Sequence, residues 1–192
     1  GDILVHLAEN PDRINVNKSG DSDINESGSV LDALIAKGYS KIIYCSSAVV
    51  YGELGTEPYI EESPVYKHDN YTKLKLSNEQ KVINAGGVVV RLTNIIGSGM
   101  AKNNVLSDII SQLNGPGAVT VRNEQPVRDF IYIDDVVSAL MRLVIEGKTG
   151  VYNVGSGIGI SIKKMAELAL RVTGKSHGVV KSLADATVLS YN

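Results

Sequence analysis

The sequence predicts an α/β fold in which helices cover a parallel sheet, with a smaller lobe attached. Short apolar, β-branched runs such as residues 88–90 alternate with stretches whose apolar residues recur at helical spacing. This alternation is typical of a parallel sheet covered by helices. After Asn94 glycines become frequent and the apolar runs shorter, which favours a second, looser α/β lobe.

The first part of the chain is expected to read strand, helix, strand. Residues 3–7 form a short apolar strand, and the polar segment 9–27 begins as loop and then enters a helix. That helix ends near Gly38, because glycine commonly terminates helices. The next apolar strand starts at Ile42.

The same alternation continues to the end of the chain. A second helix starts near Tyr71 and ends at the glycine pair 86–87. After it we expect a strand at 88–90, a helix at 105–113, a helix capped by Asp134 and Asp135 and ended by Gly147, a strand at 151–154 and a helix capped by Ser161.

Composition excludes several classes of protein. The 192 residues are 43% hydrophobic, enough for a sizeable core, and the net charge of −2 gives no broad attraction to nucleic acid or anionic lipid. The single Cys45 and three scattered histidines predict neither a disulfide nor a metal site. No apolar run approaches the roughly 20 residues of a membrane span and no signal peptide opens the chain, so the cytoplasm is expected.

Two stretches carry groups suited to acid–base chemistry. Ser46 and Ser47 follow an apolar strand, and Tyr71 and Lys75 share one face of the following helix because they lie four residues apart. A tyrosine hydroxyl is a poor base at neutral pH, but a neighbouring ammonium favours its phenolate form. Lys75 can therefore tune Tyr71. The alternative is that the serines merely end a strand and that the pair is a surface contact.

These residues, in this order, resemble a known enzyme family. Residues 2–8 (DILVHLA), 45–52 (CSSAVVYG), 70–75 (NYTKLK) and 128–135 (RDFIYIDD) are similar to motifs of the extended short-chain dehydrogenase/reductase family. Its members include NAD-dependent sugar-nucleotide epimerases and dehydratases, and the motif detail is most similar to the UDP-galactose 4-epimerase type. The resemblance covers residues 1 to about 160. It implies a partial Rossmann-like, doubly wound parallel sheet with a smaller α/β substrate lobe.

The resemblance implies a role for each matching residue. Tyr71 would take a proton from a sugar hydroxyl while hydride leaves the same carbon, Ser47 would hydrogen-bond that oxygen, and Lys75 would hold the nicotinamide ribose. The implied cofactor is NAD, with NADP not excluded. Cofactor-binding positions would be Leu7, Ala8, Ser46, Tyr71, Lys75, Leu92 and Thr93, and substrate-binding positions Ser47, Asn94, Asn104, Val105, Thr120, Arg122 and Arg128.

Several of these positions have an ordinary structural alternative. His6 is interpreted as a half-buried histidine rather than a catalytic one, and Glu79 as an exposed carboxylate without a catalytic role. Asn104 could be a plain helix cap, Arg122 a surface residue, and Arg128 the partner of a nearby carboxylate.

The chain departs from the family pattern at three places. No glycine-rich phosphate turn follows a strand here: Gly97-Ser98-Gly99 and Gly155-Ser156-Gly157 each lack the third glycine. We therefore expect a fragment that lacks the segment supplying the pyrophosphate cradle. Glu9 stands where the family usually has a second alanine, and a carboxylate there opposes phosphate. Ala48 and Val49 replace the acidic pair of the 4,6-dehydratases, which argues against dehydration.

The expected organisation and function follow from these observations. Residues 1–95 would be the C-terminal part of the nucleotide-binding domain and 96–192 a substrate lobe, with 124–155 returning to the first sheet. The resemblance implies epimerisation of a nucleotide sugar by transient hydride abstraction, in a homodimer formed through the Tyr71 helix and its neighbour. The alternatives are a keto-sugar reductase of the same family and a non-catalytic assembly module that binds no cofactor.

Overall fold

A computed structural model describes residues 1–52, 58–115, 118–175 and 179–183. The chain divides into two compact units. The first unit comprises Gly1–Gly52, Tyr59–Thr93 and Asp134–Val154. The second unit contains Asn94–Ile133 and the described residues from Gly155 onward.

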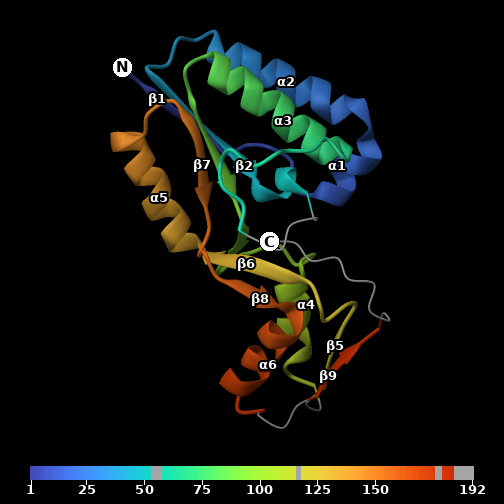
Figure 1. The fold of residues 1–192 in the computed structure, drawn as a ribbon. Helices are drawn as coiled ribbons and strands as arrows, with labels where there is room; N and C mark the ends of the chain where they lie inside the picture. Colours follow the sequence, from blue (N-terminus) through green and yellow to red (C-terminus); the bar gives the residue numbers. More distant parts are fainter. Residues whose placement is uncertain (53–57, 116–117, 176–178, 184–192) are drawn as a thin grey trace. The chain divides into compact units, whose positions relative to one another are not determined.

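The first unit is built on a four-stranded parallel sheet (Figure 1). Every neighbouring pair of strands is parallel, and residues 3–6 pair in register with 41–44. The predicted α/β class with a parallel sheet is therefore confirmed. In spatial order the strands are β1 (Ile3–His6), β2 (Lys41–Ser47), β3 (Val88–Leu92) and β7 (Gly150–Val154).

Helices lie on both faces of this sheet, with α2 and α3 side by side on one face and α5 on the other (Figure 1). Apolar residues of α2, α3 and the strands form a common core that includes Leu31, Tyr44, Val82 and Val89, all with 0% of their surface exposed. The helical elements of the first unit are α1 (Arg13–Ser19), α2 (Asp21–Ile35), the 3-10 turn η1 (Ala48–Tyr51), α3 (Asn70–Asn84) and α5 (Ile133–Glu146).

Two helix starts differ from the sequence-based expectation. The polar segment 9–27 is mostly helical, because the Asp12 side chain accepts hydrogen bonds from the backbone N–H groups of Ile14 and Asn15 and starts α1. Gly20, with φ +67°, separates α1 from α2, a backbone conformation that glycine adopts without strain. Asp134 and Asp135 lie in the first turn of α5 instead of capping it.

The described residues of the second unit form a small sheet, a separate strand pair and two helices. β4 (Asn94–Ile96) is parallel to β6 (Val127–Tyr132), and β8 (Gly159–Ser161) is antiparallel to β6. Of the segment 124–155, β7 thus joins the first unit's sheet, while β6 pairs with β4 and β8. The remaining elements are β5 (Ala118–Val121), which is parallel to β9 (Val179–Ser182), and the helices α4 (Val105–Gln112) and α6 (Ile162–Val172).

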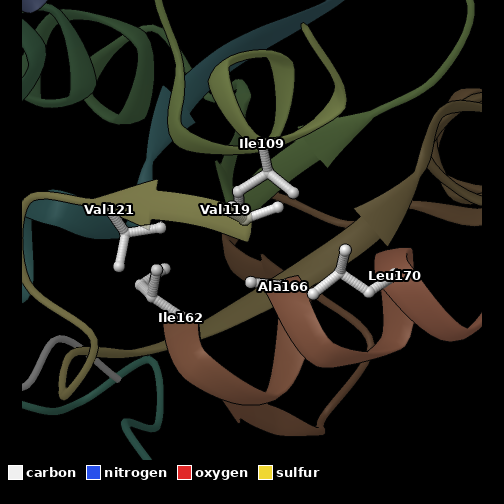
Figure 2. Close-up of a cluster of buried hydrophobic side chains, with 6 residues drawn as sticks. All are labelled: Ile109, Val119, Val121, Ile162, Ala166 and Leu170. Carbon is white, nitrogen blue, oxygen red and sulfur yellow. The ribbon is translucent and has the colours of Figure 1, made fainter. Parts of the chain in front are cut away.

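The core of the second unit is apolar. Its buried side chains come from α4, β5 and α6 and gather between these elements (Figure 2). Hydroxyl and amide caps start the two helices, since Ser161 accepts from the Lys164 backbone N–H and Asn104 from that of Ser107. The core residues are Ile109, Val119, Val121, Ile162, Ala166 and Leu170.

Among the described residues, every helix is too short or too polar to cross a membrane.

Candidate active site

The start of α3 is held in place by Asp69, which sets the direction in which Tyr71 and Lys75 project. Asp69 accepts from the backbone N–H of Thr72 at 2.8 Å, and the Thr72 hydroxyl accepts from the backbone N–H of Asp69 at 3.1 Å. Arg13 of α1 donates to Asp69 at 2.7 Å. Burial alone would raise the pKa of Asp69, but these hydrogen bonds hold it well below its usual range.

Tyr71 is buried, yet its hydroxyl is available for chemistry. Its surface is 9% exposed, and its backbone N–H donates to the Asn17 side chain at 2.9 Å. Among the residues that the structure describes, none hydrogen-bonds to the Tyr71 hydroxyl. The Lys75 ammonium lies 5.6 Å from the centre of the Tyr71 ring. An unbonded phenol beside an ammonium is suited to exchange a proton with a bound hydroxyl.

Ser47 stands at the end of β2, where η1 begins. Its Oγ accepts a long hydrogen bond, 3.4 Å, from the backbone N–H of Val49. Val49 packs against the apolar cluster that contains Tyr71. The end of β2 and the Tyr71 helix are thus neighbours in space, as the chemistry expected from the sequence requires.

Lys75 is not free, because it is paired with Glu9. The Lys75 Nζ lies 2.5 Å from Glu9 Oε2, and both side chains are only 6% exposed. Lys75 also donates to the backbone carbonyl of Cys45 at 3.1 Å. The Glu9 carboxylate accepts further hydrogen bonds from Ser27 of α2, Tyr44 of β2 and Asn78 of α3. This cluster of Glu9, Lys75, Ser27, Tyr44 and Asn78 is called the Glu9 network below.

Burial and charge shift several pKa values around this network. Burial raises the pKa of Glu9, but the Lys75 ammonium and the donated hydrogen bonds outweigh it and leave that pKa below its ordinary value. Burial and the Glu9 carboxylate raise the pKa of Tyr44. Burial raises the pKa of the Cys45 thiol to about 11 and lowers that of His6. At neutral pH the Glu9 network therefore holds a carboxylate and a neutral Tyr44, and Cys45 and His6 beside it are also neutral.

A second buried ion pair lies beside Ser46. Arg91 of β3 and Glu79 of α3 approach to 2.7 Å with side chains 6% exposed, and the Ser46 hydroxyl donates to Glu79 at 2.5 Å. Arg91 also donates to the Tyr51 hydroxyl at 2.9 Å, which in turn donates to Asn153 of β7. The interpretation of Glu79 as an exposed carboxylate was wrong: only 4% of its surface is exposed, because Arg91 and Ser46 satisfy its charge in the interior.

The sequence contains signals for both buried pairs, although sequence reasoning missed them. Arg91 interrupts the apolar run 88–92, and a charge inside a buried strand needs a partner. Glu79 follows Lys75 by four residues and so shares its inward face. Glu9 is an acidic residue just after an apolar strand, at a position where the family has alanine.

The other residues expected at the cofactor differ in their surroundings. Leu7 is 64% exposed and Ala8 is also exposed, whereas Leu92 is buried. The Thr93 backbone N–H donates to Val154 at 3.1 Å. The Ser46 hydroxyl donates its hydrogen bond to Glu79, as described above.

The nicotinamide end of a cofactor fits the residues present better than its phosphates do. An ammonium has three N–H groups, and the described residues engage two of those of Lys75, so one remains for a ribose hydroxyl. A cavity of about 320 Å³ beside Glu9 is also lined by Asp23 and Glu26, whose negative charge opposes phosphate. In the turn 155–157, the N–H groups of Ser156 and Gly157 already donate to Asp129.

The expected substrate residues all lie in the second unit, apart from Ser47. The Asn94 side chain donates to the Asp129 carbonyl at 3.0 Å, and Asn104 caps α4 with its carbonyl oxygen. Val105 packs partly buried against the apolar core. Thr120 binds Gln112 through its backbone, Arg122 is exposed, and Arg128 is half-buried in β6.

Within the described ranges, no group of three or more His, Cys, Asp or Glu side chains is arranged to hold a metal ion.

The sequence of this chain is similar to a family of known enzymes and to several of its individual members. The model of the NAD dependent epimerase/dehydratase family matches residues 1–155. A dTDP-4-dehydro-6-deoxyglucose reductase of Escherichia coli is 27% identical over 180 residues, which cover 85% of this chain and 57% of the reductase. A putative UDP-arabinose 4-epimerase of Arabidopsis thaliana is 30% identical over 176 residues, 76% of this chain and 42% of that protein. The chain thus spans about half the length of these relatives.

Solved structures show the same fold. RMD from Pseudomonas aeruginosa, determined with NADPH, superposes with a TM-score of 0.88 at 25% identity and covers 98% of this chain. UDP-glucose 4-epimerase from Thermotoga maritima, determined with UDP-glucose, gives 0.84 at 24% identity, again over 98% of this chain. The present chain covers 70% and 67% of those two chains. These similarities support the predicted partial Rossmann-like fold.

Proposed function

The chain belongs to the NAD dependent epimerase/dehydratase family, and we propose that it carries the hydride-transfer site of a nucleotide-sugar epimerase. The observation that carries this proposal is the buried Tyr71, whose hydroxyl no described residue engages, beside the Lys75 ammonium. Among the described side chains no buried nitrogen or oxygen lacks a hydrogen-bond partner, so the phenol oxygen of Tyr71, which has none, reaches the surface, where a bound molecule can meet it. An unengaged phenol at this place is suited to a bound substrate hydroxyl.

Each residue of the site has a distinct task in this proposal. Tyr71 takes the proton of the sugar hydroxyl as the C–H bond of the same carbon is broken, and gives it back when that bond reforms. Ser47 donates a hydrogen bond to the same sugar oxygen. Lys75 stabilises the Tyr71 oxygen by its charge and binds the ribose with its remaining N–H. In the second unit, taken by itself, Arg128 is suited to bind a diphosphate, since its guanidinium matches that anion.

NAD, when bound, would accept the hydride from the sugar carbon and return it to the opposite face. NADP is the alternative cofactor, which the similarity to RMD, determined with NADPH, supports.

A keto-sugar reductase is the second candidate, and the comparisons contain a specific observation in its favour. The Escherichia coli reductase matches 85% of this chain, more than the 76% matched by the Arabidopsis thaliana epimerase. The same Tyr71, Ser47 and Lys75 would serve a reductase, with Tyr71 donating the proton. Dehydration is not proposed, because Ala48 and Val49 bring no carboxyl group to the start of η1.

Turnover assays distinguish these candidates. The protein is incubated with NAD and UDP- or dTDP-hexoses, and epimers are followed by NMR. In parallel, NADH and NADPH oxidation is followed with 4-keto sugars. An epimerase uses catalytic amounts of cofactor, whereas a reductase consumes one per sugar. Tyr71→Phe should lower the rate by about 10²–10⁴-fold, the usual worth of a general acid–base group.

The matched control is Tyr66→Phe, because Tyr66 is 48% exposed. Equal rates in Tyr71→Phe and the parent protein would overturn the proposal. No turnover of any sugar, together with no cofactor binding, would favour the non-catalytic assembly module instead.

A homodimer formed through α3 and its neighbour α2, located in the cytoplasm, belongs to the same proposal. Light scattering coupled to size-exclusion chromatography tests the dimer.

A further inference from the structure

Glu9 is the feature of this site that the proposed chemistry leaves unexplained. It lies three residues after the end of β1, and its side chain is 6% exposed. A buried carboxylate is costly unless it is paired and hydrogen-bonded, and Glu9 is both. Both oxygens of this carboxylate therefore have hydrogen-bond partners within the protein.

Those partners come from three different elements. Oε1 accepts from Asn78 Nδ2 at 2.6 Å and Ser27 Oγ at 2.8 Å, and Oε2 accepts from Tyr44 at 2.8 Å as well as from Lys75. Asn78 also donates to Ser27 at 2.8 Å, which links α3 to α2. The carboxylate is thus held from the sides of α2, β2 and α3, and it cannot rotate without breaking several bonds.

Lys75 is positioned by this arrangement. Glu9 and the Cys45 carbonyl take two of its N–H groups, and the ammonium lies 5.3 Å from the Tyr44 ring centre and 5.6 Å from that of Tyr71. A lysine side chain has several rotatable bonds and would otherwise sample many positions. The hydrogen bonds to Glu9 and to the Cys45 carbonyl leave one N–H of the Lys75 ammonium and restrict the direction in which it can point.

We propose that Glu9 is a positioning residue that holds Lys75 against β2 and offsets its charge, so that Glu9 sets the pH range in which Tyr71 can exchange a proton. This role in catalysis rests on the proposed function, whereas the hold on Lys75 does not. With Glu9 in place, the positive charge that favours the phenolate of a nearby tyrosine is partly compensated. Removing the carboxylate alone leaves that charge uncompensated.

Other charged and titratable groups surround the pair of Glu9 and Lys75. His6 of β1 and Tyr44 and Cys45 of β2 are close enough for Glu9 or Lys75 to influence their pKa values. Asp23 and Glu26 of α2 line the adjoining cavity, and Tyr71 and Glu79 lie on α3. On α1, Arg13 is engaged by Asp69. Glu9 is the carboxylate in direct contact with the ammonium, so the pH effect is assigned to it.

Amine acylation tests the hold on Lys75 without any catalytic activity. The whole protein is treated with sulfo-N-hydroxysuccinimide acetate at pH 8, and the rate at each lysine is read by peptide mass spectrometry. Glu9→Gln should raise the rate at Lys75 by about tenfold or more, because a charge-assisted hydrogen bond is lost. A rate within twofold of the parent protein, in a variant whose circular dichroism is unchanged, would overturn the proposal.

The matched control is Asp32→Asn. It breaks an ion pair of the same 2.5 Å length, between Lys81 of α3 and Asp32 of α2, whose side chains are 29% and 60% exposed. Lys75 labelling should not change in this variant. If Glu9→Gln does not fold, Tyr44→Phe replaces it, since it removes one hydrogen bond to Glu9 and keeps the ring. Faster labelling of Lys75 in Tyr44→Phe supports the proposal, and an unchanged rate overturns it.

The pH profile separates positioning from a purely structural role. In Glu9→Gln the acidic limb of the turnover profile should move to lower pH, because the positive charge of Lys75 is no longer compensated by a carboxylate. An unmoved limb with unchanged Lys75 labelling would overturn the role of Glu9 and leave the proposed function standing. Responsive Lys75 labelling in a protein that turns over no sugar would instead sustain the hold on Lys75, and overturn its catalytic role together with the proposed function.

Discussion

The two units of this chain bury different kinds of side chain. The first unit encloses two ion pairs, Glu9 with Lys75 and Glu79 with Arg91, each with both side chains 6% exposed. Among the described residues, the buried side chains of the second unit are all apolar. Its polar groups serve instead as helix caps and turn contacts near the surface.

We interpret the second unit as a structural scaffold and the first unit as the part that holds the candidate site. Burial of apolar side chains stabilises a fold without any cost for removing charges from water. A buried ion pair carries that cost and is often no more stabilising than an apolar pair of the same shape. The charges of the first unit converge on the end of β2 and on α3, where Ser47 and Tyr71 also lie. We infer that the first unit tolerates buried charge because its chemistry needs it.

The largest effect should come from breaking one buried pair on one side only. Glu79→Ala leaves the Arg91 guanidinium without its partner and should lower the free energy of unfolding by about 3–5 kcal/mol. The double variant Glu79→Leu/Arg91→Leu, which removes both charges, should recover most of that loss. Urea unfolding followed by tyrosine fluorescence measures both, and a loss below about 1 kcal/mol in Glu79→Ala would show that the pair is not buried in solution.

In the second unit, a comparable loss should require removal of apolar volume. Leu170→Ala should cost roughly 2–5 kcal/mol, since Leu170 is 2% exposed within the apolar core. Hydrogen exchange should increase in peptides from α4, β5 and α6 and remain unchanged in those from β2 and β3. Exposed Val172 on the same helix supplies the control, because Val172→Ala removes no buried contact.

Acid should destabilise the first unit more than the second. The folded-state pKa values of Glu9 and Asp69 lie below their unfolded values, so their stabilisation is complete above the unfolded pKa. It is lost as the pH falls through the folded pKa, because protonation removes the charge that Lys75 and Arg13 bind. Hydrogen exchange of each unit between pH 7 and pH 3 checks this, and Glu9→Gln should show a smaller loss than the parent protein.

The smallest effect should be at an exposed pair of similar geometry. Asp32→Asn removes the partner of Lys81, and the Asp32 side chain is 60% exposed. Because water and salt screen such pairs, the expected change in unfolding free energy is at most about 0.5 kcal/mol. A change as large as that of Glu79→Ala would mean that ion-pair burial does not distinguish these sites.

Much of the fold could be predicted because local patterns specify it. The β-branched run at 88–90 predicted a buried strand, and Ser161 predicted the start of α6. The start of α1 was missed, because its cap Asp12 lies in a polar segment without apolar periodicity before it. The strand pair β5 and β9 joins residues about 60 positions apart, and no local signal indicates such a pairing.

The candidate site was predictable only in part for the same reason. Tyr71 and Lys75 share a helix turn, so their proximity follows from spacing. The partners of Glu9 lie 18 to 69 positions away in the chain, and their approach depends on how α2, β2 and α3 pack. Glu79 was assigned to the surface because the residue that neutralises it, Arg91, belongs to another element.

Cofactor binding tests the central claim, that the buried charges around Lys75 build a nicotinamide site. NADH is titrated into the protein and its fluorescence followed, with Glu9→Gln/Lys75→Met as the test variant and Asp32→Asn/Lys81→Met as the exposed counterpart. We predict saturable binding that weakens by about tenfold or more in the first variant and not in the second. Absence of binding at millimolar NADH, or equal affinity in both variants, would contradict the claim.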